Sequence, residues 1–198
     1  MAKIISLNEN HIDSIVKLHR LCLPGRILTL INPKLLAGFY ELLLKTPDVY
    51  GFCSLDKSKV TGFIVGTTDT TKLFRQLVGK IFGKPFLIGR FLWQGITSPT
   101  IFFKVLSLLF YPSKSQYGKV RAELLVVAVD PCRCRQNIGT SLVKALEQSF
   151  KKEKIPSYKV NVEESNKNAR EFYRQLDFEK RLLISQFGNK WFILAKEI

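Results

Sequence analysis

The sequence has 198 residues, of which 46% are hydrophobic, and this suits one domain with a sizeable core. Lysine and arginine (31) outnumber aspartate and glutamate (16), so the formal net charge is +15 and anionic partners are expected. The longest uncharged run, residues 91–103, is too short for a membrane-spanning helix, which needs about 20 apolar residues. We therefore predict a single domain over residues 1–198, in the cytoplasm, because the opening MAKIISLNEN turns polar too soon for a secretory leader.

The cysteines and histidines do not predict a disulfide framework or a metal site. The four cysteines are Cys22, Cys53, Cys132 and Cys134. Their spacing is not that of a disulfide scaffold. A zinc site usually needs about four ligands, and the only histidines, His11 and His19, are far in sequence from the C-x-C pair at 132 and 134.

The first third of the chain predicts an alternation of strands and helices. Residues 4–7 have the pattern of a short strand, and an amphipathic helix follows, with Asn8 or Asn10 as its cap. Gly25 ends this region, and Pro33 opens a second helix with an apolar stripe. Residues 49–54 and 60–67 are predicted to be strands joined by the turn at 56–59.

Residues 70–118 form a basic, apolar insertion that interrupts this alternation. Nine lysines and arginines, and no acidic residue, lie between Asp69 and Glu123. The periodicity predicts an amphipathic helix up to Phe82 and a second helix at 101–110. Three interpretations stay open: a lid for an anionic acceptor, a patch that contacts acidic lipid, or internal aromatics with cations facing water. No motif supports nucleic-acid binding.

The last part of the chain predicts the remaining sheet. Residues 122–129 are apolar almost throughout, so this strand is expected to be central and covered on both faces. A helix at 138–150, a strand at 158–162 and a helix at 166–176 follow. A hairpin of strands at 178–185 and 191–195, turning at Gly188, completes an α/β fold.

Two segments of this second half carry the chemical signal. The strand that ends at Pro131 leads through a basic loop into a helix at Gly139. The free backbone N–H groups of the loop and first turn therefore point to one place, beside the positive N-terminal end of the helix dipole. Such a turn holds a phosphate or pyrophosphate. In the next helix, Asn166 and Tyr173 lie on one face. Together the segments indicate a transferase that uses a phosphate-bearing carrier.

These segments resemble the GNAT superfamily of acetyl-CoA-dependent N-acetyltransferases. The first resembles the V-x-P strand end and R/Q-x-x-G-x-G/A loop of that family, and the second its N-x-x-A-x-x-F/L-Y-x-x-x-G-F block. Three positions depart from the pattern: Cys134 replaces Arg or Gln, and Asn137 and Asp177 replace Gly. Asn and Asp tolerate a positive φ better than most residues, so we expect both turns to be kept. Arg133 and Arg135 flank the missing arginine and are its expected substitutes.

The resemblance implies a mixed sheet of six to seven strands flanked by helices, with the insertion before the central cofactor-binding strand. It also implies a set of cofactor-binding residues: Val127, Val129, Arg133, Cys134, Arg135, Gln136, Asn137, Ile138, Gly139, Thr140, Asn166 and Tyr173. Tyr173 would be the general acid and Glu123 the general base, with Glu163 and Glu164 in reserve. The alternative interpretation of Tyr173 is a tyrosine of the hydrophobic core, and that of Glu123 is a carboxylate that pairs with Arg121 or Lys119. Asn161 would contact substrate or face solvent.

The expected reaction is direct transfer of an acetyl group from acetyl-CoA, without a metal, to a primary amine of a small molecule such as an amino sugar or its nucleotide. One alternative is a protein N-terminal or lysine acetyltransferase. Another is a non-catalytic acyl-CoA-binding module. A homodimer is common in the family, and peripheral contact with an acidic membrane remains an alternative use of the insertion.

Overall fold

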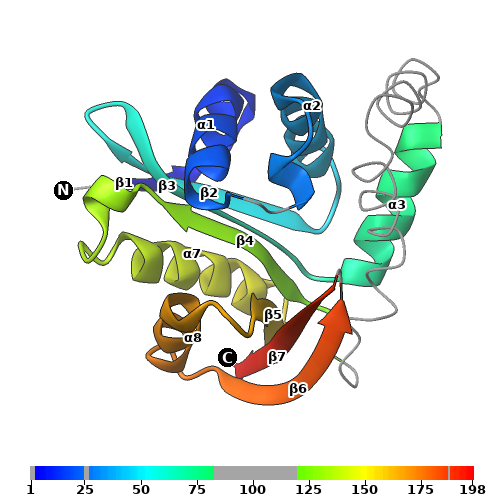
Figure 1. Cartoon of the computed structure of the whole chain (residues 1–198). Coiled ribbons are helices and arrows are strands. Elements are labelled where there is room, and N and C mark those ends of the chain that lie inside the picture. Colours follow the sequence, from blue (N-terminus) through cyan, green and yellow to red (C-terminus); the bar gives the residue numbers. More distant parts are fainter. Residues whose placement is uncertain (1–2, 25–26, 83–119, 187) are drawn as a thin grey trace.

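A seven-stranded sheet runs through the protein in the order β1-β2-β3-β4-β5-β7-β6. The computed structural model describes residues 3–24, 27–82, 120–186 and 188–198 (Figure 1). Neighbouring strands are antiparallel except β4 and β5, which are parallel. This confirms the predicted mixed sheet. The strands are β1 (Lys3–Ser6), β2 (Val49–Asp56), β3 (Lys59–Thr67), β4 (Glu123–Val129), β5 (Ser157–Glu163), β6 (Glu179–Gln186) and β7 (Asn189–Glu197).

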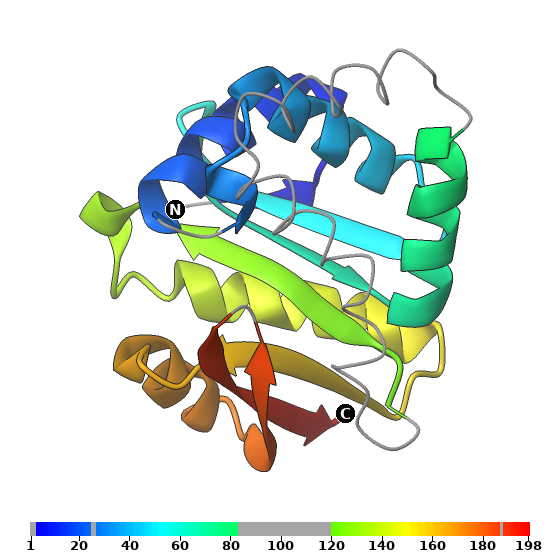
Figure 2. The ribbon, with the colours of Figure 1, turned by 45° about the vertical axis from the view of Figure 1, so that its right-hand side comes forward.

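Helices cover both faces of the sheet. The two views show α1 and α2 on one face, and α7 and α8 on the other (Figures 1 and 2). The helices are α1 (Ile12–Cys22), α2 (Pro33–Leu44), α3 (Thr70–Phe82), α7 (Ile138–Lys152) and α8 (Lys167–Arg174). Short 3₁₀ turns are η1 (Glu9–His11), η2 (Ile27–Thr29) and η4 (Pro131–Arg133). Helix α8 is shorter than the predicted span 166–176 because a left-handed turn ends it.

The α7 face of the sheet is packed with aromatic and aliphatic side chains. Phe150, Tyr158 and Phe178 meet edge to face, with ring centroids 5.3 and 5.1 Å apart along this row. Leu142 and Leu146 of α7 are fully buried beside them. Edge-to-face rings contribute about 0.5–1.5 kcal/mol per pair beyond the area that they bury. This packing holds α7 and α8 against the strands that carry the candidate site.

The α1 face has its own core, and that core contains a histidine. Ile15 and Leu36 are fully buried between α1, α2 and the sheet. Tyr40 packs edge to face on Phe63 of β3, and its hydroxyl lies 2.7 Å from Nδ1 of His19. Burial, followed by the positive charge of Arg20, lowers the pKa of His19 to about 4. His19 is therefore neutral near pH 7.

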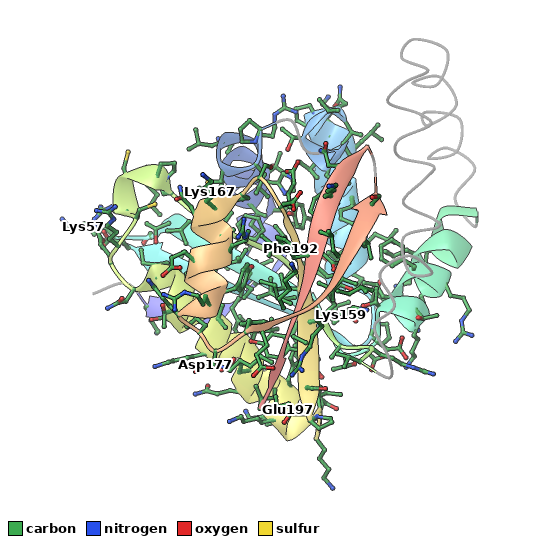
Figure 3. The ribbon with its side chains drawn as sticks, turned by 60° about the horizontal axis from the view of Figure 1, so that its bottom comes forward. Lys57, Lys159, Lys167, Asp177, Phe192 and Glu197 are labelled. Atoms are coloured by element: carbon green, nitrogen blue, oxygen red, sulfur yellow. The ribbon has the colours of Figure 1, made fainter. Side chains whose placement is uncertain are left out.

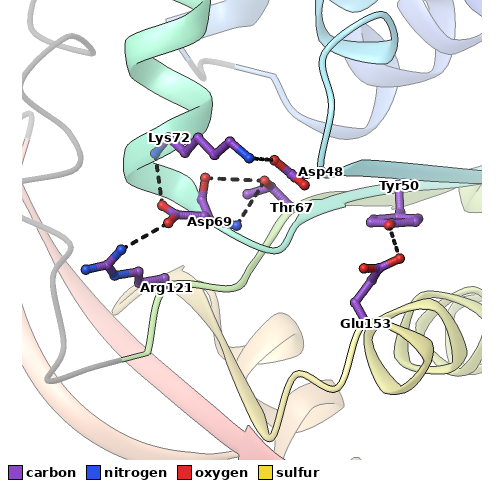
Figure 4. A network of polar contacts seen from close by, with 7 residues as sticks. All are labelled: Asp48, Tyr50, Thr67, Asp69, Lys72, Arg121 and Glu153. Atoms are coloured by element: carbon purple, nitrogen blue, oxygen red, sulfur yellow. Dashed lines mark hydrogen bonds and ion pairs between the residues drawn. The ribbon is translucent and has the colours of Figure 1, made fainter.

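The first part of the basic insertion is helix α3, as the periodicity predicted. Its start is tied to the sheet: the Asp69 carboxylate accepts a hydrogen bond from the Lys72 amide (2.9 Å) and lies 3.3 Å from the Arg121 guanidinium (Figure 4). The Lys72 ammonium pairs with Asp48. The predicted helix at 101–110 and the aromatic residues 86–103 lie outside the described residues. No helix in the described ranges is long and apolar enough to span a bilayer.

Candidate active site

The strands β4 and β5 separate soon after they meet. Their parallel pairing comprises Glu123 opposite Lys159 and Leu124 opposite Val160. At this point the register between β3 and β4 shifts at Val65, which makes a β-bulge and bends the strand. Within the described strands, the rest of β4 has no parallel partner on its β5 side. The sheet therefore opens along the second half of β4.

Backbone alternation identifies the groups that face this opening. The Asp130 amide donates to the carbonyl of Thr61 on β3, at 2.9 Å. Because successive residues of a strand direct their polar groups to opposite edges, Val127 and Val129 present theirs toward the opening. The Cys22 thiol at the end of α1 donates to the Val129 carbonyl, at 3.3 Å. Two of the predicted cofactor-binding residues thus lie where backbone groups are available.

The loop between β4 and α7 has the backbone shape of an anion-binding turn. Asn137 has φ = 58°, which confirms that it tolerates the left-handed conformation, and Arg135 has φ = 60°. The Asn137 side chain makes no capping hydrogen bond within the described part of the chain, and the first turn of α7 holds no acidic residue. The first intrahelical bond runs from the Ser141 amide to the Asn137 carbonyl. The preceding amides, 138–140, are the unpaired donors of a helix N-terminus, and they suit a pyrophosphate.

The two arginines of this loop are not equivalent. The Arg133 guanidinium lies 2.9 Å from the Asp56 carboxylate in the turn between β2 and β3. Arg135 is exposed, and no described residue forms an ion pair with it. Cys134 and Gln136 are exposed as well. Of the expected substitutes for the missing arginine, Arg135 is the one whose charge no described carboxylate offsets.

Gly139 has a packing role that the motif alone does not indicate. A Cβ atom added at this residue would lie 3.2 Å from the ring of Phe172 in α8 and 3.8 Å from Val129. The first of these distances is tighter than ordinary van der Waals contact, so the glycine lets α7 and α8 approach each other. Gly139 therefore lets the first turn of α7, directly after the loop, pack closely against the helix that carries Tyr173.

Helix α8 is fixed at both ends, which Lys167 and Asp177 mark in Figure 3. The Asn166 side chain accepts a hydrogen bond from the Ala169 amide at 3.0 Å, so it caps the helix. At the other end Asp177 has φ = 64°, and the amides of Asp177 and Phe178 bond back to the carbonyls of Arg174 and Tyr173. This is the Schellman arrangement, and it confirms that Asp177 keeps the turn.

Tyr173 lies inside the molecule between Phe172 and Phe178, with ring centroids 5.2 and 5.1 Å away. It is 4% exposed. Burial raises its pKa well above the ordinary value of a phenol, so the hydroxyl stays protonated at neutral pH. No hydrogen bond to that hydroxyl comes from the residues that the structure describes. Tyr173 is thus a tyrosine of the hydrophobic core whose hydroxyl is protonated.

Glu123 belongs to a buried polar network. Its side chain is 1% exposed, and its carboxylate accepts hydrogen bonds from the Thr70 hydroxyl (2.9 Å) and the Asn161 amide (3.0 Å). The Lys159 ammonium lies 3.7 Å away and is 3% exposed. Arg121 pairs with Asp69 instead of Glu123, and Lys119 lies outside the described residues. The alternative in which Arg121 neutralises Glu123 is therefore wrong, and Asn161 is partly buried rather than solvent-exposed.

Lys159 and Thr70 are the members of this network that the sequence analysis missed. Lys159 is the one charged residue inside the β5 stretch between Tyr158 and Val162. Tyr158 and Val160 pack on the α7 face, so Lys159 and Asn161 face α1 to α3, as Glu123 does. A lone lysine flanked by buried apolar residues was the signal that could have identified it. Thr70 had no comparable signal, because the contact depends on where α3 begins.

Comparisons with known proteins agree with this geometry. A model of the Acetyltransferase (GNAT) family matches residues 100–178. No curated protein matches the sequence significantly. Among solved structures, the ribosomal-protein-S18-alanine N-acetyltransferase of Escherichia coli is similar over 100% of this chain and 94% of its own, with 15% identity and a TM-score of 0.63.

Two further structures share the fold. NAA60 of Arabidopsis thaliana, in complex with a bisubstrate analogue, has a TM-score of 0.65 at 12% identity and covers 100% of this chain and 99% of its own. The PaiA N-acetyltransferase of Thermoplasma acidophilum, in complex with coenzyme A, has a TM-score of 0.59 at 14% identity and covers 100% and 99%. Residues 100–178 therefore match the GNAT family of acetyl-CoA-dependent acyltransferases, and the chain shares the fold of these N-acetyltransferases.

Proposed function

We propose that this acyltransferase moves the acetyl group of acetyl-CoA directly to a primary amine of a small molecule, such as an amino sugar or its nucleotide. The observation that carries the proposal is the opening between β4 and β5: Glu123 lies at its paired end, and the loop that leads into the N-terminus of α7 follows the other end of β4. Holding both reactants in such an opening supplies part of the rate by proximity.

The donor half of the site is built from backbone. Val127 and Val129 would bind the pantetheine arm and polarise the thioester carbonyl, because their polar groups face the opening. The loop and first helical turn, residues 133–140, would hold the pyrophosphate. Asn166 would orient the cofactor through its amide nitrogen, since its oxygen already caps α8.

Tyr173 would give its proton to the thiolate of coenzyme A as the thioester breaks. The position of Tyr173 in the α8 motif supports this role: the phenol is protonated at neutral pH and has a proton to give, although the burial that raises its pKa makes it a weaker acid. Glu123 would accept the proton that the ammonium group of the acceptor must lose before its nitrogen attacks. Asn161, which donates to Glu123, would contact the acceptor on the same face of the sheet.

The net charge of +15 supports an anionic acceptor over a simple cationic amine, because a basic protein attracts negative groups and repels positive ones. A second candidate is the N-terminal amine of a protein. It is favoured by the names of two similar structures, the ribosomal-protein-S18-alanine N-acetyltransferase and NAA60. A lysine side chain of a protein belongs to the same alternative.

The test is turnover of acetyl-CoA with a panel of amines, measured as release of free coenzyme A thiol. The panel contains amino sugars, their nucleotides, simple amines, and peptides with free or blocked N-termini. Preference for amino sugars or their nucleotides supports the proposal, and preference for free peptide N-termini supports the second candidate.

The non-catalytic alternative is separated by the same experiment with Tyr173→Phe. Removing the acid is expected to lower kcat by about 10²- to 10⁴-fold while acetyl-CoA binding is kept. Binding of acetyl-CoA without turnover of any amine would favour the binding module. A kcat equal to that of the wild type in Tyr173→Phe would disprove the acid role.

A further inference from the structure

The buried network around Glu123 lies where β4 and β5 begin to separate. Glu123 and Lys159 are opposite each other at the first paired position, so the ion pair lies at the end where β4 and β5 are still hydrogen-bonded, just before they separate. The carboxylate accepts hydrogen bonds on both oxygens: Oε1 from the Asn161 amide and Oε2 from the Thr70 hydroxyl. The lysine that completes the network is labelled in Figure 3.

A buried ion pair stabilises a fold inefficiently, so we expect this one to have a role other than stability. Taking two charges out of water costs several kcal/mol per ion, and well-packed apolar residues of similar size are often as stable or more stable. The neighbouring side chains of β5 are apolar and buried. Burial lowers the pKa of Lys159, while Glu123 and, more weakly, Asp69 oppose that effect. The Glu123 carboxylate is the strongest of the influences that favour the charged form of Lys159.

Among the residues that the structure describes, two carboxylates act on Lys159. Glu123 lies on β4, and Asp69 lies just before α3, where it is itself paired with Arg121. On β7, the strand paired with β5, the side chain of Lys196 points to the other face and pairs with Glu147 of α7, at 2.8 Å. Glu123 is therefore the principal counter-charge of Lys159 among the described residues.

We propose that Lys159 is a positioning residue that holds the Glu123 carboxylate ionised and fixed between Thr70 and Asn161, so that this carboxylate receives the proton of the acceptor amine. The inference rests on the proposed role of Glu123 as the base. In the step considered, the ammonium of the acceptor loses a proton, one carboxylate oxygen of Glu123 gains it, and Lys159 keeps its own protons. The neighbouring positive charge disfavours the protonated carboxylic acid, so Glu123 is driven to pass the proton on to water and return to its ionised state.

The Thr70 hydroxyl connects the pair of Glu123 and Lys159 to the start of the basic insertion. It lies 2.9 Å from the Glu123 carboxylate and also 2.9 Å from the Arg121 carbonyl, and it has a single proton to donate. The ionised carboxylate is the stronger acceptor of the two. The charge state of Glu123 is thereby linked to the two chain segments, at 69–70 and 121–123, that lead into and out of the insertion.

The experiment follows the side-chain carboxyl carbon of Glu123 by NMR during a pH titration, with Glu123→Gln identifying the signal. It compares the wild type with Lys159→Met, and it needs no acceptor. Removing the cation is expected to raise the titration midpoint of Glu123 by about one unit or more. Lys159→Arg is expected to keep the midpoint near that of the wild type, and Lys159→Gln, which retains a donor without charge, replaces Lys159→Met if that variant does not fold.

Lys196→Met is the matched control, because it removes a partly buried lysine from the other face of the same sheet. A midpoint that Lys159→Met leaves unchanged would overturn the proposal, and so would an equal shift in Lys196→Met. With the amine that the panel identifies, the rise of kcat/KM with pH should move to higher pH in Lys159→Met. Full activity of Glu123→Gln would disprove the base role while leaving the NMR result to decide the effect of Lys159 on the carboxylate.

Discussion

The two faces of the sheet bury different kinds of side chain. The face under α7 and α8 holds a row of aromatic rings, Phe150, Tyr158 and Phe178 among them, beside aliphatic residues of the helix. The face under α1 to α3 buries a histidine and the ion pair of Glu123 with Lys159. The first face is therefore held mainly by ring packing, and the second also buries a charged pair deep in the protein.

This difference agrees with a division of labour in the proposed reaction. The loop at 133–140 and Tyr173, which would serve the donor, are held by packing against α7 and α8. Glu123 and Asn161, which would serve the acceptor, are held by hydrogen bonds and charge. Packing forces hardly change with pH, whereas charged networks do. Mutations on the two faces should therefore differ both in size and in pH dependence.

The largest effect is expected from breaking the buried ion pair. Glu123→Gln leaves the Lys159 ammonium without its main counter-charge, and we expect the free energy of unfolding to fall by about 3–5 kcal/mol. The matched variant on the other face is Glu147→Gln, because Glu147 accepts from Tyr158 (2.7 Å) and pairs with Lys196 nearer the surface. It should cost about 1–2 kcal/mol. Urea unfolding at neutral pH measures both, and equal losses would contradict the contrast between the faces.

The second effect is a loss of stability in mild acid through His19. Its pKa is about 4 in the fold and about 6.5 in the unfolded chain, so the charged form is disfavoured in the folded protein. Stability from this group is complete above pH 6.5 and is lost as the pH falls toward 4, by on the order of 3 kcal/mol. Unfolding free energies measured from pH 7 to 4 should fall less steeply in His19→Gln.

His11→Gln removes the other histidine, at the start of α1, and serves as the control for that series. It should retain the steep fall of the wild type between pH 6.5 and 4. An equally steep fall in His19→Gln would show that other groups on the α1 face cause the acid sensitivity.

The third effect tests the packing between α7 and α8. Gly139→Ala places a Cβ atom 3.2 Å from the Phe172 ring, and we expect a loss of about 1–3 kcal/mol. The double variant with Phe172→Leu should recover part of it, because the smaller side chain makes room. Gly38→Ala in α2 is the control: a Cβ there meets nothing within 4 Å, so the gain in helix propensity should stabilise the protein by up to about 1 kcal/mol.

The smallest effect concerns the two arginines of the loop. Arg135→Ala should weaken acetyl-CoA binding by about fivefold, or roughly 1 kcal/mol, because its exposed charge is available to the pyrophosphate. Arg133→Ala should weaken binding less, since that guanidinium already pairs with Asp56. Calorimetric titration at low and high salt measures both, and a larger loss in Arg133→Ala would reverse the assignment.

Much of the fold was predictable because its elements have local causes. Pro33 and the apolar stripe of α2, the turn at 56–59, and the alternation of the last hairpin depend on neighbours in the sequence, and the helices and strands lie where these patterns predicted. The left-handed turns at Asn137 and Asp177 were predictable for the same reason. The proposed roles of Tyr173 and Asn161 remain predictions.

The sequence by itself determined the order of the elements and the two motifs that resemble the GNAT family, since each is encoded by residues a few positions apart. Only the tertiary structure decided that Glu123 pairs with Lys159 rather than with Arg121, that Thr70 completes the network, and that Gly139 accommodates Phe172. The physical reason is that strand register and helix packing bring together residues distant in the chain. The separation of β4 from β5 is also tertiary, because it accompanies a register shift against β3 in a strand whose residues after Glu123 are all apolar.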